Sequence, residues 1–298
     1  MINKVKKAVI PVAGLGTRML PATKAIPKEL LPVFDRPIIE HVVKEAISCG
    51  ITEIIFVTRS GKEAIENHFD ANYELEHRLE KKGKNKILGT IKNIIPDGIK
   101  VSSIRQHNAL GLGHAILCAK HLIKKEPFAV LLPDIILLDK PSYELNYSFM
   151  KLIEAWDSSG IGQIMVERVE ASQVESYGIV DINKVSLSPF ASIKIKKLVE
   201  KPVIKEAPSN LAVLGRYVLP GIILDILDDT CPGVGDEIQL TDALDKLLQK
   251  DTLNALFTNA TTFDCGNKEG FLGANLALGM RDKKVKKYLK NLISENKW

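Results

Sequence analysis

Cysteine is scarce in this chain of 298 residues, and its spacing excludes several kinds of site. The sequence has no CxxC pair and no Cys/His spacing typical of a zinc site. We therefore expect four reduced thiols in a cytoplasmic protein: Cys49, Cys118, Cys231 and Cys265. No apolar run reaches the roughly 18 residues that a membrane-spanning helix requires. The charged N-terminus leads directly into an apolar segment, so we expect neither a signal peptide nor a membrane partner.

Long runs of one charge sign are scarce, and the Lys-rich segments at residues 81–84 and 283–284 are most simply solvated helix faces or loops. The chain has 41 Lys and Arg against 36 Asp and Glu, a net charge of +5, and the two signs alternate along most of it. A nucleic-acid footprint requires clustered basic residues, so we expect no nucleic-acid partner, whereas a mild positive bias suits a small anionic substrate. Hydrophobic residues make up 45% of the chain, enough for a sizeable core. Internal repeats, low-complexity tracts and linkers are absent, which predicts one domain over residues 1–298.

A glycine-containing turn follows the first apolar run of the chain. Residues 8–12 predict a buried parallel strand, and they lead into Ala13-Gly14-Leu15-Gly16-Thr17-Arg18. Two glycines allow a tight turn whose amides can bind phosphate oxygens, and the Arg18 guanidinium, Lys24 and Lys28 add positive charge. The combination predicts a triphosphate site. Gly-x-Gly alone is a weak signal, because Met19 stands where a dinucleotide fingerprint has its third glycine and no Walker Gly-Lys-Ser/Thr follows.

Polar residues also end two later predicted strands. The strand predicted over residues 99–106 ends at Gln106, shortly before Gly111, and the strongly apolar strand over 128–134 ends at Asp134. Ligands of open α/β sheets bind at the carboxyl ends of strands, so we expect these residues near the glycine turn. Gln106 matches the mixed edge of a base, and Asp134 is suited to Mg²⁺. Ordinary turn or capping roles remain open for both residues.

In two further segments an acidic residue lies close to a lysine or a glycine. In Val199-Glu200-Lys201-Pro202 the two charged side chains point to opposite sides of an extended segment. A carboxylate can accept hydrogen bonds from sugar hydroxyls and a lysine can neutralise a phosphate, although an ordinary exposed charge pair explains the residues equally well. Asp264 ends another predicted strand beside Gly266. Helices are predicted over residues 37–50, 62–82, 115–124, 236–243 and 270–290.

A set of separated motifs, in order along nearly the whole chain, resembles the sugar-1-phosphate nucleotidylyltransferases. The motifs are AGLGTR with PKELLP, RQ…GLGHA, LLPD, YGIVD, VEKP, SNLAVLGRYVL, GDEIQLTDA and DCGNKEG. The Pro-Lys-Glu form at residues 27–29 is similar to the bacterial uridylyltransferases of that family. The resemblance implies a Rossmann-like mixed, mostly parallel sheet flanked by helices, with a small antiparallel sugar-binding excursion. It also implies Mg²⁺-dependent condensation of UTP with glucose 1-phosphate to UDP-glucose and pyrophosphate, by a homodimer or homotetramer.

The same resemblance implies roles for individual residues. It assigns nucleotide contacts to Ala13, Gly14, Gly16, Thr17, Glu29, Gln106 and Gly111, catalysis to Arg18, Lys28, Lys201 and Asp134, metal to Asp134 and Asp264, and sugar binding to Gly178, Glu200 and Lys201. It also implies a nucleotide-binding half over about residues 1–140, a sugar-binding half over about 141–270 and a helical tail over 271–298. Two departures stand out: Asp264 lies in DCG where thymidylyl relatives have Asp-Thr-Gly, and Ile135 follows Asp134 where some relatives carry a further acid.

The implied chemistry requires no general base, and the sequence has no Ser/His/Asp or Cys/His constellation. An ionised sugar phosphate is itself the nucleophile, so the protein must position and neutralise a polyanion. The same reaction with dTTP, CTP or galactose 1-phosphate remains open, and Pro-Lys-Glu favours uridylyl over thymidylyl transfer. A non-catalytic nucleotide-sugar sensor is expected to lack one of the four catalytic candidates, all of which are present. A dehydrogenase is disfavoured by the missing third glycine.

Overall fold

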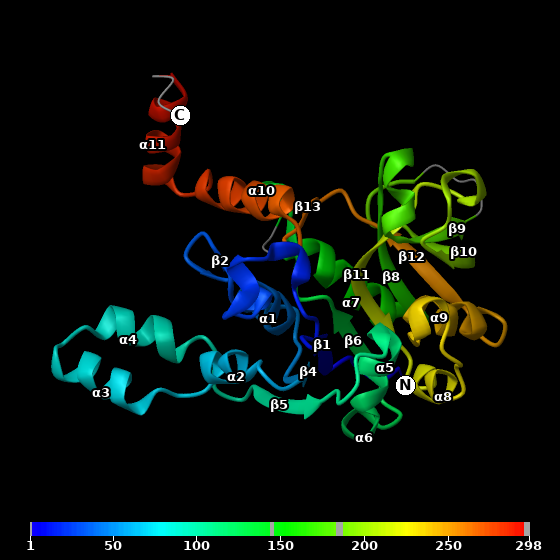
Figure 1. The fold of residues 1–298 in the computed structure, drawn as a ribbon, viewed down its shortest axis with the longest axis horizontal. Coiled ribbons are helices and arrows are strands. Elements are labelled where there is room, and N and C mark those ends of the chain that lie inside the picture. The colour runs from blue at the N-terminus through cyan, green and yellow to red at the C-terminus, as the bar shows by residue number, and fades with distance from the viewer. Residues whose placement is uncertain (1, 144–145, 183–186, 295–298) are drawn as a thin grey trace.

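The computed structural model describes residues 2–143, 146–182 and 187–294 (Figure 1). Within these ranges, nine strands form one mixed sheet. In spatial order they are β5 (Lys100–Arg105), β4 (Glu53–Thr58), β1 (Lys7–Pro11), β6 (Phe128–Leu131), β11 (Leu211–Leu219), β8 (Gly162–Arg168), β12 (Leu253–Phe257), β10 (Ser192–Glu200) and β9 (Gly178–Ile182). Two small ribbons pair β7 (Ile135–Leu138) with β13 (Thr261–Asp264), and β2 (Pro32–Val33) with β3 (Arg36–Pro37).

Strand direction divides this sheet into two parts. The four strands β5, β4, β1 and β6 are parallel neighbours, whereas β11 is antiparallel to both β6 and β8. Following the pairings, seven of the nine described strands run one way, and β10 and β11 run the other way. The mixed, mostly parallel sheet is therefore confirmed. The antiparallel excursion is the pairing of β9 with β10.

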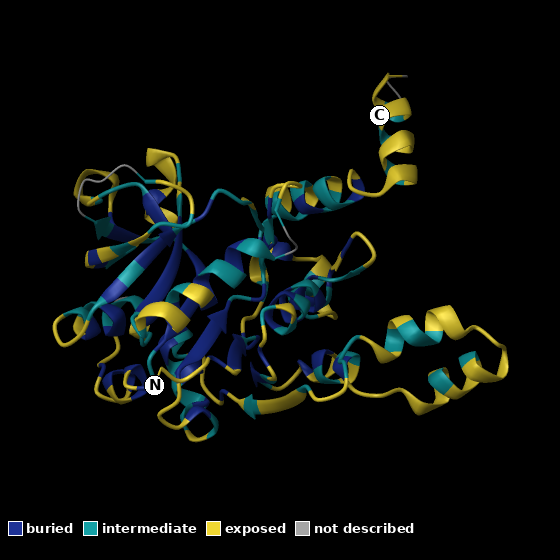
Figure 2. Cartoon of the chain, turned by 180° about the vertical axis from the view of Figure 1, so that it is seen from behind, coloured by how far each residue is buried: buried dark blue, intermediate teal, exposed yellow. Residues whose placement is uncertain are grey.

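Helices cover both faces of the sheet, as the ribbon shows (Figure 1). One core lies under α1 (Ile38–Ser48), α2 (Glu63–Phe69) and α7 (Tyr147–Ser159), and the other under α5 (Gly111–Cys118), α6 (Lys120–Ile123), α8 (Ile223–Asp228) and α9 (Leu240–Leu248). The remaining described helices are α3 (Tyr73–Lys81), α4 (Asn85–Lys92), α10 (Lys268–Gly279) and α11 (Lys283–Ser294). Figure 2 shows α3, α4 and α11 as largely exposed projections from the buried sheet.

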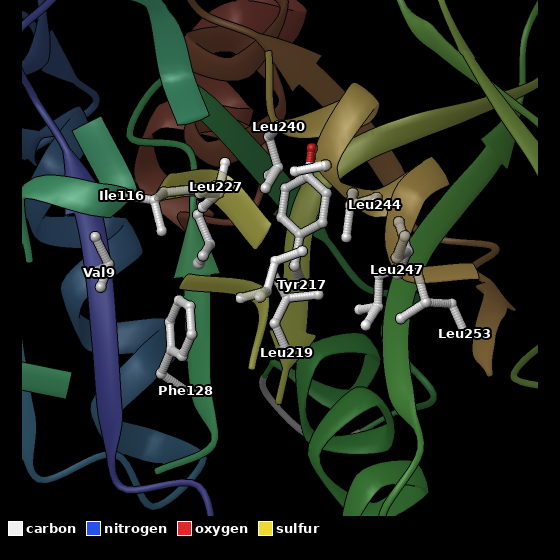
Figure 3. Close-up of a cluster of buried hydrophobic side chains, with 14 of the residues drawn as sticks. Val9, Ile116, Phe128, Tyr217, Leu219, Leu227, Leu240, Leu244, Leu247 and Leu253 are labelled. Carbon is white, nitrogen blue, oxygen red and sulfur yellow. The ribbon is translucent and has the colours of Figure 1, made fainter. Parts of the chain in front are cut away.

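Successive side chains of each buried strand pack alternately into the two cores. Ile10 packs with α1 and α7, whereas its neighbour Val9 points to the opposite face. Figure 3 shows that opposite core, in which Val9 and Phe128 lie on the strand side and Leu227 and Leu244 come from the helices around Tyr217. Burial of a side chain of this kind stabilises the fold by about 1.5–3 kcal/mol. Apolar residues on both faces explain why these strands appear in the sequence as unbroken hydrophobic runs.

Several helix boundaries differ from the predictions. The single helix expected over residues 62–82 is two helices, because Asp70 is extended and the Asn72 side chain caps α3 by accepting a hydrogen bond from Leu75 N. The helix expected from residue 236 begins at Leu240, because Gly235 and Asp236 both have positive φ. Its two acids therefore precede the helix instead of opening it.

The tail is also two helices, α10 and α11. The Asp282 carboxylate between them accepts hydrogen bonds from Lys284 N and Val285 N, so it caps the start of α11. Residues 295–298 of the predicted tail lie outside the described residues. Across the described part of the chain, no helix combines the length and the apolar character needed to cross a membrane.

Candidate active site

The glycine turn after β1 wraps around the Lys28 side chain. Gly16 has φ +71°, in the left-handed region that favours glycine, and a Cβ there would lie 3.2 Å from Lys28 Cβ. A Cβ on Gly14 would lie 3.8 Å from Lys28 Cε. The Thr23 hydroxyl donates to Gly16 O at 2.7 Å and holds the turn from the other side. The backbone of this turn therefore stands directly beside a lysine, as a phosphate-binding loop requires.

Lys28 is paired with Asp134, across more than one hundred residues of sequence. Lys28 Nζ lies 2.5 Å from Asp134 Oδ2, and the two side chains are only 16% and 13% exposed. Burial alone would lower the pKa of Lys28, but attraction to the Asp134 carboxylate outweighs it, so that the pKa is raised. Burial likewise opposes ionisation of Asp134, and Lys28 reverses the effect, lowering the pKa of Asp134. Both groups are therefore charged at neutral pH.

A second acid reaches the same point through the ribbon of β7 and β13. Because Ile135 pairs with Asp264 in that ribbon, Asp264 lies next to the residue that follows Asp134. Arg18 Nη1 lies 3.4 Å from Asp264 Oδ2. A Cβ on Gly266 would lie 2.8 Å from Arg18 Nη2, 2.9 Å from Asp264 Oδ1 and 3.0 Å from Asp134 Oδ2. The two acids and the arginine therefore converge around Gly266, and Asp134 and the glycine turn lie on one edge of the sheet.

A cavity of about 410 Å³ lies between this cluster and the start of α5. Seven of the predicted site residues line it: Ala13, Gly14, Lys28, Glu29, Gln106, Gly111 and Asp134. Gln106 Nε2 donates to Gly111 O at 3.1 Å and lies 3.0 Å from His114 Nδ1, so the amide is held in one orientation. The helix predicted from residue 115 begins earlier, because α5 starts at Gly111. Gly111 has φ +91°, and a Cβ on it would lie 2.7 Å from Glu237 Cβ.

Glu29 is a buried acid in the wall of this cavity. The Lys62 ammonium donates to Glu29 Oε2 at 2.7 Å, whereas Glu29 Oε1 has no hydrogen-bond partner among the described residues. Burial raises the pKa of Glu29, and the attraction of Lys62 only partly offsets that effect. Buried polar atoms are nearly always hydrogen-bonded in native proteins, so the free oxygen marks a place for a ligand donor.

A second cavity, of about 630 Å³, meets the first at Leu132 and Asp134. Arg18 and Asp264 line it together with residues that the sequence argument missed: Glu167, Tyr177 and Thr262 are among them. The Thr262 hydroxyl lies 2.9 and 2.7 Å from the two oxygens of the Glu167 carboxylate. Burial raises the pKa of Glu167. The signal that could have identified Glu167 is its place near the carboxyl end of a buried strand.

The three predicted sugar-binding residues lie together beside the second cavity, but they are not among its lining residues. Gly178 pairs with Glu200 across β9 and β10, and Glu200 Oε2 accepts a hydrogen bond from the Thr241 hydroxyl at 2.7 Å. Lys201 has φ +43° and a side chain that is 60% exposed. Its backbone N–H donates to Tyr177 O at 3.0 Å, which ties this group to the cavity wall. Gly16 and Thr17, in the glycine turn, also do not line either cavity.

Residues 7–280 match the family model described as nucleotidyl transferase. The chain belongs to the nucleotidyl transferase family. A UTP–glucose-1-phosphate uridylyltransferase of Haemophilus influenzae is 49% identical over 287 residues, covering 96% of this chain and 97% of the relative. The Escherichia coli K12 protein of the same name is 51% identical over 279 residues, covering 94% and 92%. The resemblance to bacterial uridylyltransferases is thereby confirmed.

Solved structures of other nucleotidyl transferases agree in fold. A UTP-bound UGPase from Acinetobacter baumannii has a TM-score of 0.89 and 48% identity, covering 98% of this chain and 99% of that one. A UDP-glucose pyrophosphorylase complexed with UDP-glucose has a TM-score of 0.83 and 36% identity, covering 93% and 100%. The Rossmann-like fold class predicted from the motifs is therefore confirmed.

Proposed function

We propose that this chain transfers UMP from UTP to glucose 1-phosphate, giving UDP-glucose and pyrophosphate, with Mg²⁺ as cofactor. The observation that carries the proposal is that two cavities meet at Asp134, beside Lys28 and Arg18. One cavity then takes the nucleotide and the other the sugar phosphate, so that the two phosphates meet where the cations and acids gather. The names of the similar proteins, and the bound UTP and UDP-glucose in the names of two of the structures, support the same substrates.

The nucleotide is assigned to the cavity that Glu29 and Gln106 line. The free Glu29 Oε1 is suited to accept the imide N–H of uracil, and the fixed Gln106 amide is suited to a base edge. The glycine turn offers backbone amides to the triphosphate, and Arg18 and Lys28 neutralise it. Ala13, Gly14 and Gly111 then form the close walls of the base and ribose site.

The sugar phosphate is assigned to the second cavity. Glu200 and Gly178 lie at its margin, where a carboxylate can accept hydrogen bonds from glucose hydroxyls. The exposed Lys201 ammonium can fold over the phosphate of the sugar, because its backbone is already tied to Tyr177 in the cavity wall. Glu167 and Tyr177 are additional candidates for hydroxyl contacts.

Catalysis in this arrangement rests on positioning and charge. The sugar phosphate is ionised at neutral pH and attacks the α-phosphorus of UTP directly, so no side chain has to remove a proton. Arg18, Lys28 and Lys201 stabilise the charge that builds on the transferring group and the leaving pyrophosphate. Because the sugar phosphate is the nucleophile, the site needs no nucleophilic serine or cysteine.

Asp134 and Asp264 fit a magnesium ion. Mg²⁺ is commonly bound by one or two carboxylates together with substrate phosphates, and these two carboxylates converge beside Arg18 and Gly266. When bound, the ion would add charge neutralisation at the phosphate oxygens. In the described structure Lys28 occupies Asp134 Oδ2, so the ammonium provides the counter-charge for that carboxylate.

The test is pyrophosphate release by the purified chain with glucose 1-phosphate, Mg²⁺ and each of UTP, dTTP and CTP in turn. We expect release with UTP far above the other two, and loss of release when a chelator replaces Mg²⁺. Galactose 1-phosphate in place of glucose 1-phosphate tests the sugar. Binding of UDP-glucose without any release would instead support the non-catalytic sensor.

We also propose a cytoplasmic homodimer or homotetramer, by resemblance. Exposed apolar side chains on α10 support an association surface; Leu272 and Leu276 are 59% and 46% exposed. Light scattering coupled to size-exclusion chromatography measures the mass directly, and a monomer at micromolar concentration would contradict the proposal.

A further inference from the structure

Arg216 is a fully buried cation that substrate binding does not use. It lies on β11, next to β6, and its exposed fraction is 0%. Burying a charge without partners is strongly unfavourable, so each guanidinium donor must be accounted for. Two of them form a bidentate pair with Glu45 of α1: Nε lies 2.9 Å from Oε1 and Nη2 lies 2.8 Å from Oε2. The Glu45 carboxylate neutralises the charge of Arg216, but three N–H donors of the guanidinium still need acceptors.

Those donors bind the backbone on both sides of Asp134. Within β11, Arg216 Nη1 donates to Gly215 O at 3.3 Å. Nη1 also donates to Leu132 O at 3.1 Å, and Nη2 donates to Ile135 O at 2.7 Å. The two carbonyls flank the segment Pro133-Asp134. The guanidinium therefore spans the segment from behind, while the Asp134 carboxylate faces Lys28 and the cavities on the other side.

A bulge in β11 brings the arginine to this position. Val213 of β11 pairs with Val166 of β8, and Tyr217 pairs with Ile164. β11 therefore advances four residues where β8 advances two, and the extra residues form the bulge. Within it Gly215 has φ +68°, and a Cβ there would lie 2.6 Å from the Leu132 side chain. Leu132 N also donates to Gly215 O at 2.9 Å. The close approach of the two backbones thus requires glycine, and it aims the next residue at the Asp134 segment.

We propose that Arg216, held in place by Glu45, is a positioning residue that sets the orientation of the Asp134 carboxylate toward the metal and the nucleotide phosphates. This inference rests on the proposed function, because Asp134 must first act as the metal ligand. Arg216 touches no substrate in this arrangement. Its effect passes through the carbonyls of Leu132 and Ile135, which fix the backbone from which Asp134 projects.

Arg216→Lys is the informative variant. Lysine keeps the charge, so Glu45 is not left unpaired in the core, but a single ammonium cannot reach the carboxylate and both carbonyls as the planar fork does. Glu45→Gln is the second variant, because it releases the arginine from its anchor. The matched control is Glu126→Gln: Glu126 also pairs with a buried cation that bonds a carbonyl, since Lys7 Nζ contacts Glu126 Oε1 at 3.0 Å and Leu122 O at 2.8 Å.

The decisive readout is UTP affinity by calorimetry, measured once with Mg²⁺ and once with a chelator. The ratio of the two affinities reports how well the acids hold the metal against the nucleotide. Loss of a partner that orients a metal ligand typically costs about 10- to 100-fold, so we expect the ratio and kcat to fall by that amount in Arg216→Lys and Glu45→Gln. The metal-free UTP affinity and the values for Glu126→Gln should remain those of the wild type.

The outcomes separate the inference from the proposed function. Folded variants that keep the wild-type ratio and kcat would show that Arg216 only stabilises the core, and would overturn the inference. Failure of both variants to fold would lead to the same conclusion. If the wild type itself shows no metal-linked gain and releases no pyrophosphate, the proposed function fails first.

Discussion

Replacing Asp134 by asparagine tests the centre of the proposed site. The substitution keeps the size of the side chain and one acceptor for Lys28 Nζ, which lies 2.5 Å from Asp134 Oδ2. It removes the negative charge on which metal binding depends. Removing one preorganised charge-stabilising group from an active site costs about 10²- to 10³-fold in kcat, or about 2.7–4 kcal/mol of transition-state stabilisation. We expect a loss in kcat of at least that size.

The same substitution also changes Lys28. Burial lowers the pKa of Lys28, and Asp134 is the main group that reverses this effect. Without the carboxylate charge, burial dominates, so the pKa of Lys28 should fall below its usual value. The ammonium would then lose its proton at lower pH than in the wild type, and residual activity should decline earlier as pH rises. Initial rates of pyrophosphate release between about pH 7 and pH 10 measure this shift.

Asp139 provides the matched control. It is a buried carboxylate five residues later, and it accepts hydrogen bonds from Ser148 instead of facing the two site cavities. Asp139→Asn should lower the melting temperature and leave kcat near that of the wild type. Circular dichroism shows whether each variant is folded. A folded Asp134→Asn with near-normal kcat, or an equal loss of kcat in folded Asp139→Asn, would refute the assignment of Asp134.

Four further predictions concern the site and the stability of the fold. Gly266→Ala places a Cβ within 2.8–3.0 Å of Arg18 and both acids, so kcat should fall while the melting temperature changes little. Lys201→Met should raise the KM for glucose 1-phosphate more than the KM for UTP. Burial opposes ionisation of Glu40, but His68, Lys44 and Arg36 lower its pKa to about 2, from 4.5. The ionised Glu40 should therefore add at most about 3 kcal/mol to the free energy of unfolding, in full above pH 4.5 and progressively less as pH falls toward 2. Denaturant unfolding of Glu40→Gln should lack this pH-dependent change. Ellman's reagent should label the exposed Cys231 in the native protein but not Cys265, since burial raises the pKa of that thiol to about 12.

Site residues that lie directly after a single strand were predictable from the sequence. The glycine turn, Gln106 and Asp134 each end or follow a predicted strand, and parallel strands bring their carboxyl ends to one edge. The register of β1 on β6, with Val9 beside Val130, confirms that the segments after these two strands are neighbours. Pattern and chain order were sufficient here, because the geometry of parallel pairing is general.

Contacts that depend on distant pairing were not predictable in the same way. Asp264 reaches Asp134 only because β13 pairs with β7, and neither strand is long enough to have a clear pattern of its own. Lys62, in a charged segment that suggests a solvated helix, is instead buried against Glu29. Helix ends were misplaced where one side chain decided them, as Asn72 does for α3. Such choices depend on local competition that hydrophobic periodicity does not record.

Strand direction changes between β6 and β11, next to the candidate site. The loops after β1 and β6 carry the site residues, and β11 carries the buried Arg216 that contacts the segment after β6. Parallel β1 and β6 contribute their carboxyl ends, so the loops that follow them face the substrates. A parallel strand in the place of β11 would add a third loop to the same crowded edge. The register of antiparallel β11 on β6 places Arg216 opposite Leu131, from where it donates to the carbonyls on both sides of Pro133-Asp134. The mixed sheet thus combines the substrate-facing loops that follow β1 and β6 with a buried arginine on β11, which holds the segment after β6 from within the sheet.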